Sequence, residues 1–223
     1  MSEPSRLAAL TGVSKRFHRG PETVHALRSV SFAVDAGELV GVVGPSGSGK
    51  TTLINMLCGW EHPDEGEVSW MGTSPDMARV GWDEIAVVPQ RLGLLDELSL
   101  ADNIGLPLML AGQKSRRRAG RVREVIELLE LGSLADRRPR QVSFGEQQRT
   151  ALARALVTAP RLVIADEPTG HQDATREATI FGALRAAVSS GAACLVATHS
   201  QRAIEQLDRV VEMEDGEIVG ERR

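Results

Sequence analysis

The sequence predicts an α/β fold with a largely parallel sheet, to which a β-rich N-terminal segment and a helical insertion are added. Short continuous apolar runs recur along the chain, and such runs are typical of strands that are buried on both faces. They lie at 39–43, 85–88, 162–165 and 193–198. The order of segments is the second observation: a β-rich start, alternating strands and helices, a long helical region, and alternation again. That order favours an α/β architecture.

The first third of the chain favours strands. Segments 7–17 and 24–34 are β-rich, and the second alternates apolar with polar residues, with Leu27 as the exception. The apolar positions of that alternation are Val24, Ala26, Val30, Phe32 and Val34. A turn at 35–38 leads into the first buried run, and a further strand pair is expected around 65–70.

The helical region extends from residue 99 to about 158. An apolar stripe at helical spacing predicts an amphipathic helix there, with Val122, Val125, Ile126, Leu129 and Leu131 on one face. At the C-terminus, segment 210–219 predicts a hairpin that turns at Asp215-Gly216. The expected organisation is a single domain over 1–223, with an α/β core and β subdomain (1–92 and 159–223) and a helical subdomain (93–158).

Composition limits the possible functions. The net charge is −4, so no nucleic-acid partner is expected. The N-terminus has no apolar core of a signal peptide, and no apolar run approaches the roughly 20 residues that span a bilayer. We therefore expect a cytoplasmic chain whose membrane role comes through a partner. Cys58 and Cys194 have neither metal-ligand nor disulfide-framework spacing, which favours two buried thiols in a reducing compartment.

A glycine-rich loop follows the first buried run and precedes a helix expected over 50–58. It matches G-x-x-x-x-G-K-[ST] with Gly44, Pro45, Ser46, Gly47, Ser48, Gly49, Lys50 and Thr51. Glycines let successive N–H groups point at phosphate oxygens, and the helix adds its positive end. Lys50 can reach the β- and γ-phosphates and the Thr51 hydroxyl can ligate Mg²⁺. The alternative is a Gly/Ser-rich turn that matches by chance.

The choice of lysine supports the phosphate loop. Among 26 basic residues only Lys15, Lys50 and Lys114 are lysines, and the remaining 23 are arginines. A compact ammonium fits a phosphate cradle better than a planar guanidinium. The loop alone predicts that the chain binds a nucleoside triphosphate.

The apolar run 162–165 ends in two carboxylates, Asp166 and Glu167. In a parallel sheet, ligands bind beyond the carboxyl ends of the strands, so this pair is expected to face the phosphates. Asp166 is placed to hold Mg²⁺ through water, and Glu167 to polarise the attacking water. The alternative is that the acidic pair caps the N-terminus of a helix.

Four motifs resemble those of ABC ATPases, in the order that this family has. They are the Walker A loop 44–51, the signature 142–149 (VSFGEQQR), the Walker B segment 165–170 (ADEPTG) and the switch histidine in 198–200 (THS). The resemblance covers essentially the whole chain, and the signature is its most specific part. It implies a P-loop NTPase (RecA-like) core with an N-terminal antiparallel β subdomain and an inserted α-helical subdomain.

The resemblance also implies roles for single residues. Phe17 matches the aromatic that stacks on adenine, although a Phe at a strand end is also an ordinary core residue. Gln90 matches the glutamine that contacts Mg²⁺ and water. His199 matches the histidine that touches the γ-phosphate, the alternative being a core histidine. Asp173 matches an aspartate that communicates across a dimer. The remaining implied contacts to ATP come from Thr52, Ser143, Gly145 and Glu146.

In this family, each phosphate loop is completed by the signature of a second subunit. The resemblance therefore implies a head-to-tail dimer, identical subunits being expected, that binds ATP with Mg²⁺ and drives a separately encoded membrane permease near 90–110. The chain would lie at the inner face of the membrane. Segments 94–104 and 165–170 look most similar to the ATPases of lipoprotein-release, macrolide-efflux and antimicrobial-peptide export systems. An amino-acid-type importer and a soluble ABC ATPase remain alternatives.

Two places depart from the family pattern. In the signature, Phe144 stands where a glycine normally allows close approach to the γ-phosphate, and the D-loop reads His171-Gln172-Asp173. We hypothesise that Phe144 weakens closure of the dimer or slows hydrolysis. The equal alternative is that it packs outward against a neighbouring helix.

A basic run at 114–118, extended by Arg121 and Arg123, is the only biased stretch. Charge runs are usually solvated helix surfaces. The alternative is a surface that meets anionic lipid headgroups or an acidic partner.

Overall fold

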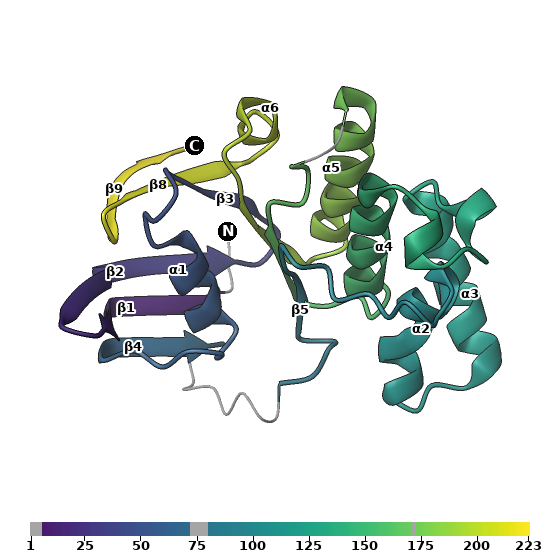
Figure 1. Cartoon of the computed structure of the whole chain (residues 1–223), viewed down its shortest axis with the longest axis horizontal. Coiled ribbons are helices and arrows are strands. Elements are labelled where there is room, and N and C mark those ends of the chain that lie inside the picture. Colours follow the sequence, from purple (N-terminus) through teal and green to yellow (C-terminus); the bar gives the residue numbers. More distant parts are fainter. Residues whose placement is uncertain (1–5, 72–79, 171–172) are drawn as a thin grey trace.

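A computed structural model of the chain, which describes residues 6–71, 80–170 and 173–223, has the predicted α/β fold (Figure 1). The strands are β1 (Arg6–Arg19), β2 (Glu22–Asp35), β3 (Leu39–Val43), β4 (Glu65–Trp70), β5 (Ile85–Val88), β6 (Leu162–Asp166), β7 (Ala193–Ala197), β8 (Arg209–Glu214) and β9 (Glu217–Arg222). The α-helices are α1 (Lys50–Leu57), α2 (Leu100–Leu110), α3 (Ser115–Leu128), α4 (Phe144–Leu156), α5 (Ala174–Ser189) and α6 (Gln201–Ile204). Two short 3₁₀ turns are η2 (Gly132–Leu134) and η3 (Pro139–Gln141).

The central sheet has the order β5-β6-β7-β3-β8-β9, in which neighbouring strands are parallel except for the final β8–β9 pair. The predicted apolar runs form strands of this sheet, and successive residues along a strand pack on opposite faces of the sheet. Val163 packs in the cluster that contains Leu184 of α5, whereas Ile164 packs in the cluster that contains Leu53 of α1. Burial on both faces explains why these runs have no polar alternation.

The second sheet is antiparallel, in the order β2-β1-β4. The strand pair predicted around 65–70 is a single strand, β4, which pairs with β1. The alternation predicted for 24–34 is out of step in its first half, because Leu27 is buried while Val24 is 37% exposed. Ser29, with φ 50°, lies where the pairing with β1 shifts register, and such an irregularity moves the side chains before it to the other face.

Helices α2, α3 and α4 lie together in a lobe beside the central sheet (Figure 1). The predicted stripe on α3 and just after it faces inward, with Val125, Ile126, Leu129 and Leu131 buried. At the C-terminus, β8 and β9 form the predicted hairpin, and Asp215 (φ 47°) and Gly216 (φ 83°) make its turn. Within the residues that the structure describes, none of the helices is long and apolar enough to cross a membrane.

Candidate nucleotide-binding site

The glycine-rich loop connects β3 to α1, and its backbone conformation requires glycine at two close contacts. Gly44 and Gly49 have φ values of 152° and 104°. A Cβ atom at Gly44 would lie 2.2 Å from the carbonyl oxygen of Met213, and one at Gly49 would lie 2.6 Å from that of Ala26. The Gly216 N–H also donates to the Ser48 carbonyl at 3.1 Å, so the β8–β9 turn supports the loop from behind.

The Lys50 side chain folds over the mouth of this loop. Its Nζ donates hydrogen bonds to the Gly44 and Pro45 carbonyl oxygens, at 2.8 and 2.9 Å. The Ser48 hydroxyl oxygen beneath the loop is buried, without a hydrogen-bond partner in the described part of the chain. The loop therefore presents a positive charge at its mouth, as a phosphate site requires.

Asp166 ends β6 at the same edge of the sheet. Burial raises the pKa of its carboxyl group, as does the neighbouring charge of Glu167, and the Lys50 ammonium opposes both effects. Two carboxylates with one ammonium make a site where a divalent cation relieves electrostatic strain.

Glu167 is joined to His199, which follows β7. The imidazole Nδ1 lies 2.7 Å from Oε1 of Glu167. The Glu167 N–H donates to the Ala197 carbonyl at 2.9 Å, and the residue has φ 53°, a left-handed conformation in which non-glycine residues are rare. The His199 side chain is 76% exposed, which excludes the core-histidine alternative. The helix-cap alternative for the acidic pair is also wrong, because Asp173 is the N-cap of α5.

These residues face one open pocket of about 540 Å³. Its lining consists of Gly44, Pro45, Ser46, Gly47, Lys50, Thr51, Gln90, Asp166, Glu167 and His199. Every lining residue belongs to the predicted site, and they come from the ends of β3, β5, β6 and β7. Ser48, Gly49 and Thr52 belong to the same loop and helix but do not line the pocket.

The structure does not bring Phe17 into this pocket. Phe17 lies near the far end of β1, where it pairs with Val24 of β2. Its ring is half-buried, and the Lys15 Nζ lies 5.5 Å from the ring centroid. This cation–π contact is compatible with a ring that keeps one face accessible.

The predicted signature residues also lie outside the pocket, at the start of α4. Ser143 is the N-cap of this helix and shares a capping box with Glu146. The Ser143 N–H and Oγ donate to Oε2 of Glu146, at 2.7 and 2.8 Å. Burial raises the pKa of Glu146, but these bonds together with the charges of Arg149 and Arg176 outweigh it, and the pKa lies below its ordinary value. Both side chains thus define where the helix begins.

Phe144, the unusual signature residue, is 44% exposed and borders a smaller pocket of about 100 Å³. The other lining residues of that pocket are Val88, Gln90, Leu92, Gln148, Asp166, Glu167, Pro168, Gly170 and His199. Phe144 therefore lies toward the edge of its own sheet at which Asp166 and Glu167 stand.

Asp173 caps α5 through a hydrogen bond from the Arg176 N–H to Oδ1, at 3.0 Å, and an ion pair with the Arg176 guanidinium, at 3.2 Å. It lies outside the pocket as well. The other two D-loop positions, His171 and Gln172, lie outside the described residues.

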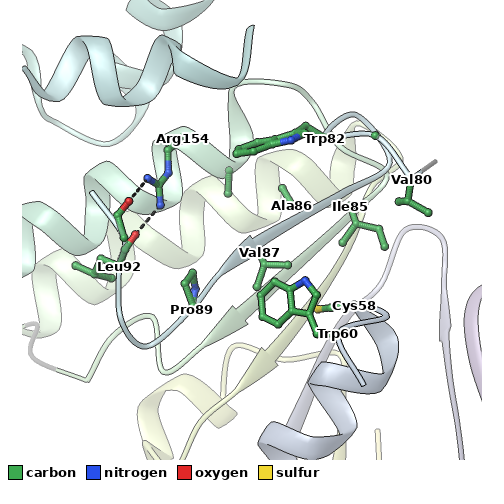
Figure 2. A pocket seen from close by; sticks show the side chains of 13 residues that line it. Cys58, Trp60, Val80, Trp82, Ile85, Ala86, Val87, Pro89, Leu92 and Arg154 are labelled. Carbon is green, nitrogen blue, oxygen red and sulfur yellow. Dashed lines mark hydrogen bonds between the residues drawn. The ribbon is translucent and has the colours of Figure 1, made fainter. Parts of the chain in front are cut away.

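A second pocket, of about 350 Å³, lies around the start and end of β5 (Figure 2). Trp60 and Trp82 line it and are 59% and 50% exposed. Arg154 of α4 fixes one wall, because its guanidinium donates to the Leu92 and Gly93 carbonyls at 2.5 and 2.7 Å. The two tryptophans were not identified from the sequence, although Trp82, one of only seven aromatic residues, stands eight positions before Gln90 and was a usable signal.

Comparisons with known proteins agree with this geometry. Residues 27–170 match the family model described as ABC transporter. The lipoprotein-releasing system ATP-binding protein LolD 2 of Caulobacter vibrioides is 37% identical over 98% of each chain. The macrolide export ATP-binding/permease protein MacB 1 of Aeromonas hydrophila subsp. hydrophila is 36% identical over all of this chain, which spans only 35% of that longer protein.

A solved structure shows the same fold. The ATP-binding cassette MJ0796, a dimer in a post-hydrolysis state bound to ADP and Pi, has a TM-score of 0.89 and 31% identity, with 97% of this chain and 98% of that chain covered. The family match, the full-length relative and the fold agree. The chain therefore belongs to the ABC transporter family, as one of its ATP-binding cassettes.

Proposed function

We propose that this chain binds and hydrolyses ATP as the nucleotide-binding subunit of an ABC transporter. The observation that carries the proposal is the single pocket in which Lys50 and Thr51 meet Asp166, Glu167 and His199. A phosphate cradle, an acidic strand end and an exposed imidazole at one edge of a parallel sheet are the groups that phosphoryl transfer to water needs.

Mg²⁺ fits this site. The pocket offers the Thr51 hydroxyl, the Gln90 amide oxygen and the Asp166 carboxylate, and oxygen ligands are those that Mg²⁺ prefers. No cluster of three or more His, Cys, Asp or Glu side chains occurs in the described segments, so phosphates and water would complete the coordination. When bound, the ion neutralises charge on the β- and γ-phosphates.

Glu167 and His199 have distinct tasks in the hydrolysis step. Oε1 of Glu167 is bonded to Nδ1 of His199, which leaves Oε2 to accept a hydrogen bond from the attacking water. With Nδ1 held in this way, Nε2 is the ring nitrogen that can reach the γ-phosphate. Lys50, released from its two loop carbonyls, would pair with the β- and γ-phosphate oxygens.

The pocket of one chain holds only part of the proposed site, which favours a dimer. Ser143, Gly145, Glu146 and Asp173 lie outside it, and in a head-to-tail dimer they would approach the ATP of the second subunit. To contact a γ-phosphate, the Ser143 hydroxyl would have to give up its 2.8 Å hydrogen bond to Glu146 and turn toward the second subunit. ATP would thereby join the subunits and hydrolysis would release them.

A membrane permease is the proposed partner, and the tryptophan-lined pocket is the proposed contact. It adjoins Gln90 through Pro89, Leu92 and Gly93, so a partner seated there can sense the nucleotide site. The chain would then work at the cytoplasmic face of the membrane, held by that permease. Relatives named for macrolide export and lipoprotein release support an export or extraction task, with an amino-acid-type importer as the alternative.

Hydrolysis by the purified chain tests the enzymatic part of this proposal. Mg²⁺-dependent release of phosphate from ATP is expected, and Lys50→Ala should abolish it. Matched activity of that variant, or of the metal-free protein, contradicts the proposal. Co-purification with the product of a neighbouring permease gene tests the partner, and absence of such a gene would favour a soluble ABC ATPase.

A further inference from the structure

The turn that joins α2 to α3 combines exposed apolar and basic side chains. Met109 and Leu110, which we call the apolar tip, are 52% and 66% exposed at the end of α2. Gly112, with φ 71°, turns the chain toward α3. A basic patch follows at once, formed by Lys114, Arg116, Arg117, Arg118 and Arg123, of which Arg118 is half-buried and the other four are exposed.

The charge of this segment contrasts with that of the whole chain. Residues 114–123 contain six basic side chains and no acidic one, whereas the chain as a whole has a net charge of −4. Within the described residues, none of the five patch side chains forms an ion pair with a carboxylate. Positive charge at the start of α3, with no acidic residue in its first turn, is unfavourable for the helix. Ion pairs within the described residues therefore do not account for the positive charge of the patch.

Arg121 shows what a structural arginine in this segment does. Its Nε and Nη2 donate to the Val157 and Leu156 carbonyls, at 3.1 and 3.0 Å, and its Nη1 pairs with Glu124 at 2.9 Å. The patch residues have no comparable set of partners, which separates them from an arginine that holds the lobe together.

Helices α2 and α3 pack closely against each other beneath the tip and patch. A Cβ atom at Gly105 would lie 3.3 Å from Cγ2 of Val122. The Arg118 stem lies over the same glycine, with its Cδ 3.9 Å from that position. Basic heads at the ends of long stems and an apolar tip are thus held on one helical hairpin.

We propose that this surface binds a bilayer that contains anionic lipids. Arginine and lysine heads would pair with lipid phosphates, while Met109 and Leu110 would enter the interface between headgroups and acyl chains. Peripheral membrane proteins combine these two kinds of contact, because neither basic charge nor two apolar side chains alone give stable membrane binding.

A flat lipid surface fits better than an acidic peptide. Neither the tip nor the patch lines any of the four pockets described for this chain, which agrees with a surface that meets a flat bilayer. In the view of Figure 1, the α2–α3 turn lies on the lower side of the molecule, as does the segment that leads into β5. Residues of that segment and of β5 line the tryptophan-lined pocket. Lipid binding would therefore orient the proposed permease contact toward the membrane.

Vesicle sedimentation with the purified full chain tests the proposal. We expect binding to phosphatidylcholine vesicles with about one third phosphatidylglycerol, loss of binding between about 0.05 and 0.5 M NaCl, and none to phosphatidylcholine alone. The triple change Arg116→Gln, Arg117→Gln, Arg118→Gln should weaken partitioning about 100-fold. Met109→Ser with Leu110→Ser should weaken it about tenfold.

The matched control replaces three exposed arginines elsewhere, Arg202→Gln, Arg222→Gln and Arg223→Gln, with the same change in net charge. It should leave partitioning within about twofold. No sedimentation with anionic vesicles at low salt, equal binding to phosphatidylcholine, or an equal loss in the control would each overturn the proposal. Unchanged thermal unfolding of the variants shows that they fold. The sedimentation assay contains no ATP, so its result does not depend on whether the chain hydrolyses ATP. The two proposals can therefore fail independently.

Discussion

Nδ1 of His199 lies 2.7 Å from Oε1 of Glu167, and the two residues follow the neighbouring parallel strands β7 and β6. The His199 side chain is mostly exposed while that of Glu167 is mostly buried, at 76% and 18% exposed. An exposed imidazole thus fixes the orientation of a sheltered carboxylate. This contact joins the residue proposed to touch the γ-phosphate, His199, to the residue proposed to polarise water, Glu167.

Replacing His199 with Ala should slow hydrolysis without preventing ATP binding. The imidazole is not part of the phosphate loop, so we expect Kd for ATP to change by less than about threefold and kcat to fall about 100-fold. Steady-state hydrolysis and nucleotide titration measure the two effects. His25→Ala, an exposed histidine of β2, is the control. A kcat within twofold of the unmodified chain would mean that His199 does not act in the reaction.

Gly49→Ala should destabilise the phosphate loop. The added Cβ would meet the Ala26 carbonyl at 2.6 Å, and alanine disfavours a φ of 104°. We expect a loss of about 1–3 kcal/mol in the free energy of unfolding, together with weaker ATP binding. Gly120→Ala in α3, where a Cβ meets nothing within 4 Å, should be neutral or stabilise by about 0.5–1 kcal/mol. Equal behaviour of the two variants in chemical denaturation would contradict this.

Asp166→Asn should stabilise the metal-free protein at neutral pH while abolishing Mg²⁺-dependent hydrolysis. Burial and the Glu167 charge raise the pKa of Asp166 above its unfolded value. The contribution of Asp166 to stability is therefore fully present at a pH below its pKa in the unfolded chain. It is lost as the pH rises through its pKa in the folded protein. At pH 7 the amide removes a charge penalty, so Tm should rise by about 2 °C. The gain should shrink toward pH 4, and a pH-independent difference would refute this cause.

Much of the site is predictable from the sequence, because its parts are local. A buried strand, a glycine loop and an acidic strand end each have a pattern within ten residues, and the parallel sheet brings Lys50, Asp166 and His199 to one edge. The long-range relationships are not local. The spacing of Ser143 and Glu146 in the sequence matches a capping box and so predicts the start of α4. The approach of Phe144 to the end of β6, in contrast, depends on how the helical lobe packs on the sheet.

Two other features of the fold could not be predicted from the sequence, for physical reasons. Which side chains of β2 face the core depends on the irregularity at Ser29, and the apolar pattern of the sequence does not reveal that irregularity. The sequence leads to no prediction for α5, whose buried face has only the three large apolar side chains Ile180, Phe181 and Leu184 among alanines. Its N-cap, Asp173, was a usable signal.

Phe144→Gly should change the rate of hydrolysis. Phe144 borders the pocket next to Glu167 and His199 and stands at the first position of α4, where closure of a dimer would press it against phosphate. We expect kcat to rise about threefold or more and ATP-dependent association to tighten, with a loss of about 1 kcal/mol in stability from glycine in the helix. Val142→Ala is the neighbouring control. An unchanged rate would show that Phe144 does not restrain the site.

The most direct measurement is the association state of Glu167→Gln with and without ATP, by sedimentation velocity. If Glu167 polarises water in a site that two subunits share, the variant should bind ATP, hydrolyse it at least about 100-fold more slowly and accumulate as a dimer. Glu205→Gln, an exposed glutamate after α6, should hydrolyse ATP normally and return to monomer. Normal turnover by Glu167→Gln, or a variant that binds ATP and stays monomeric, would contradict the shared site.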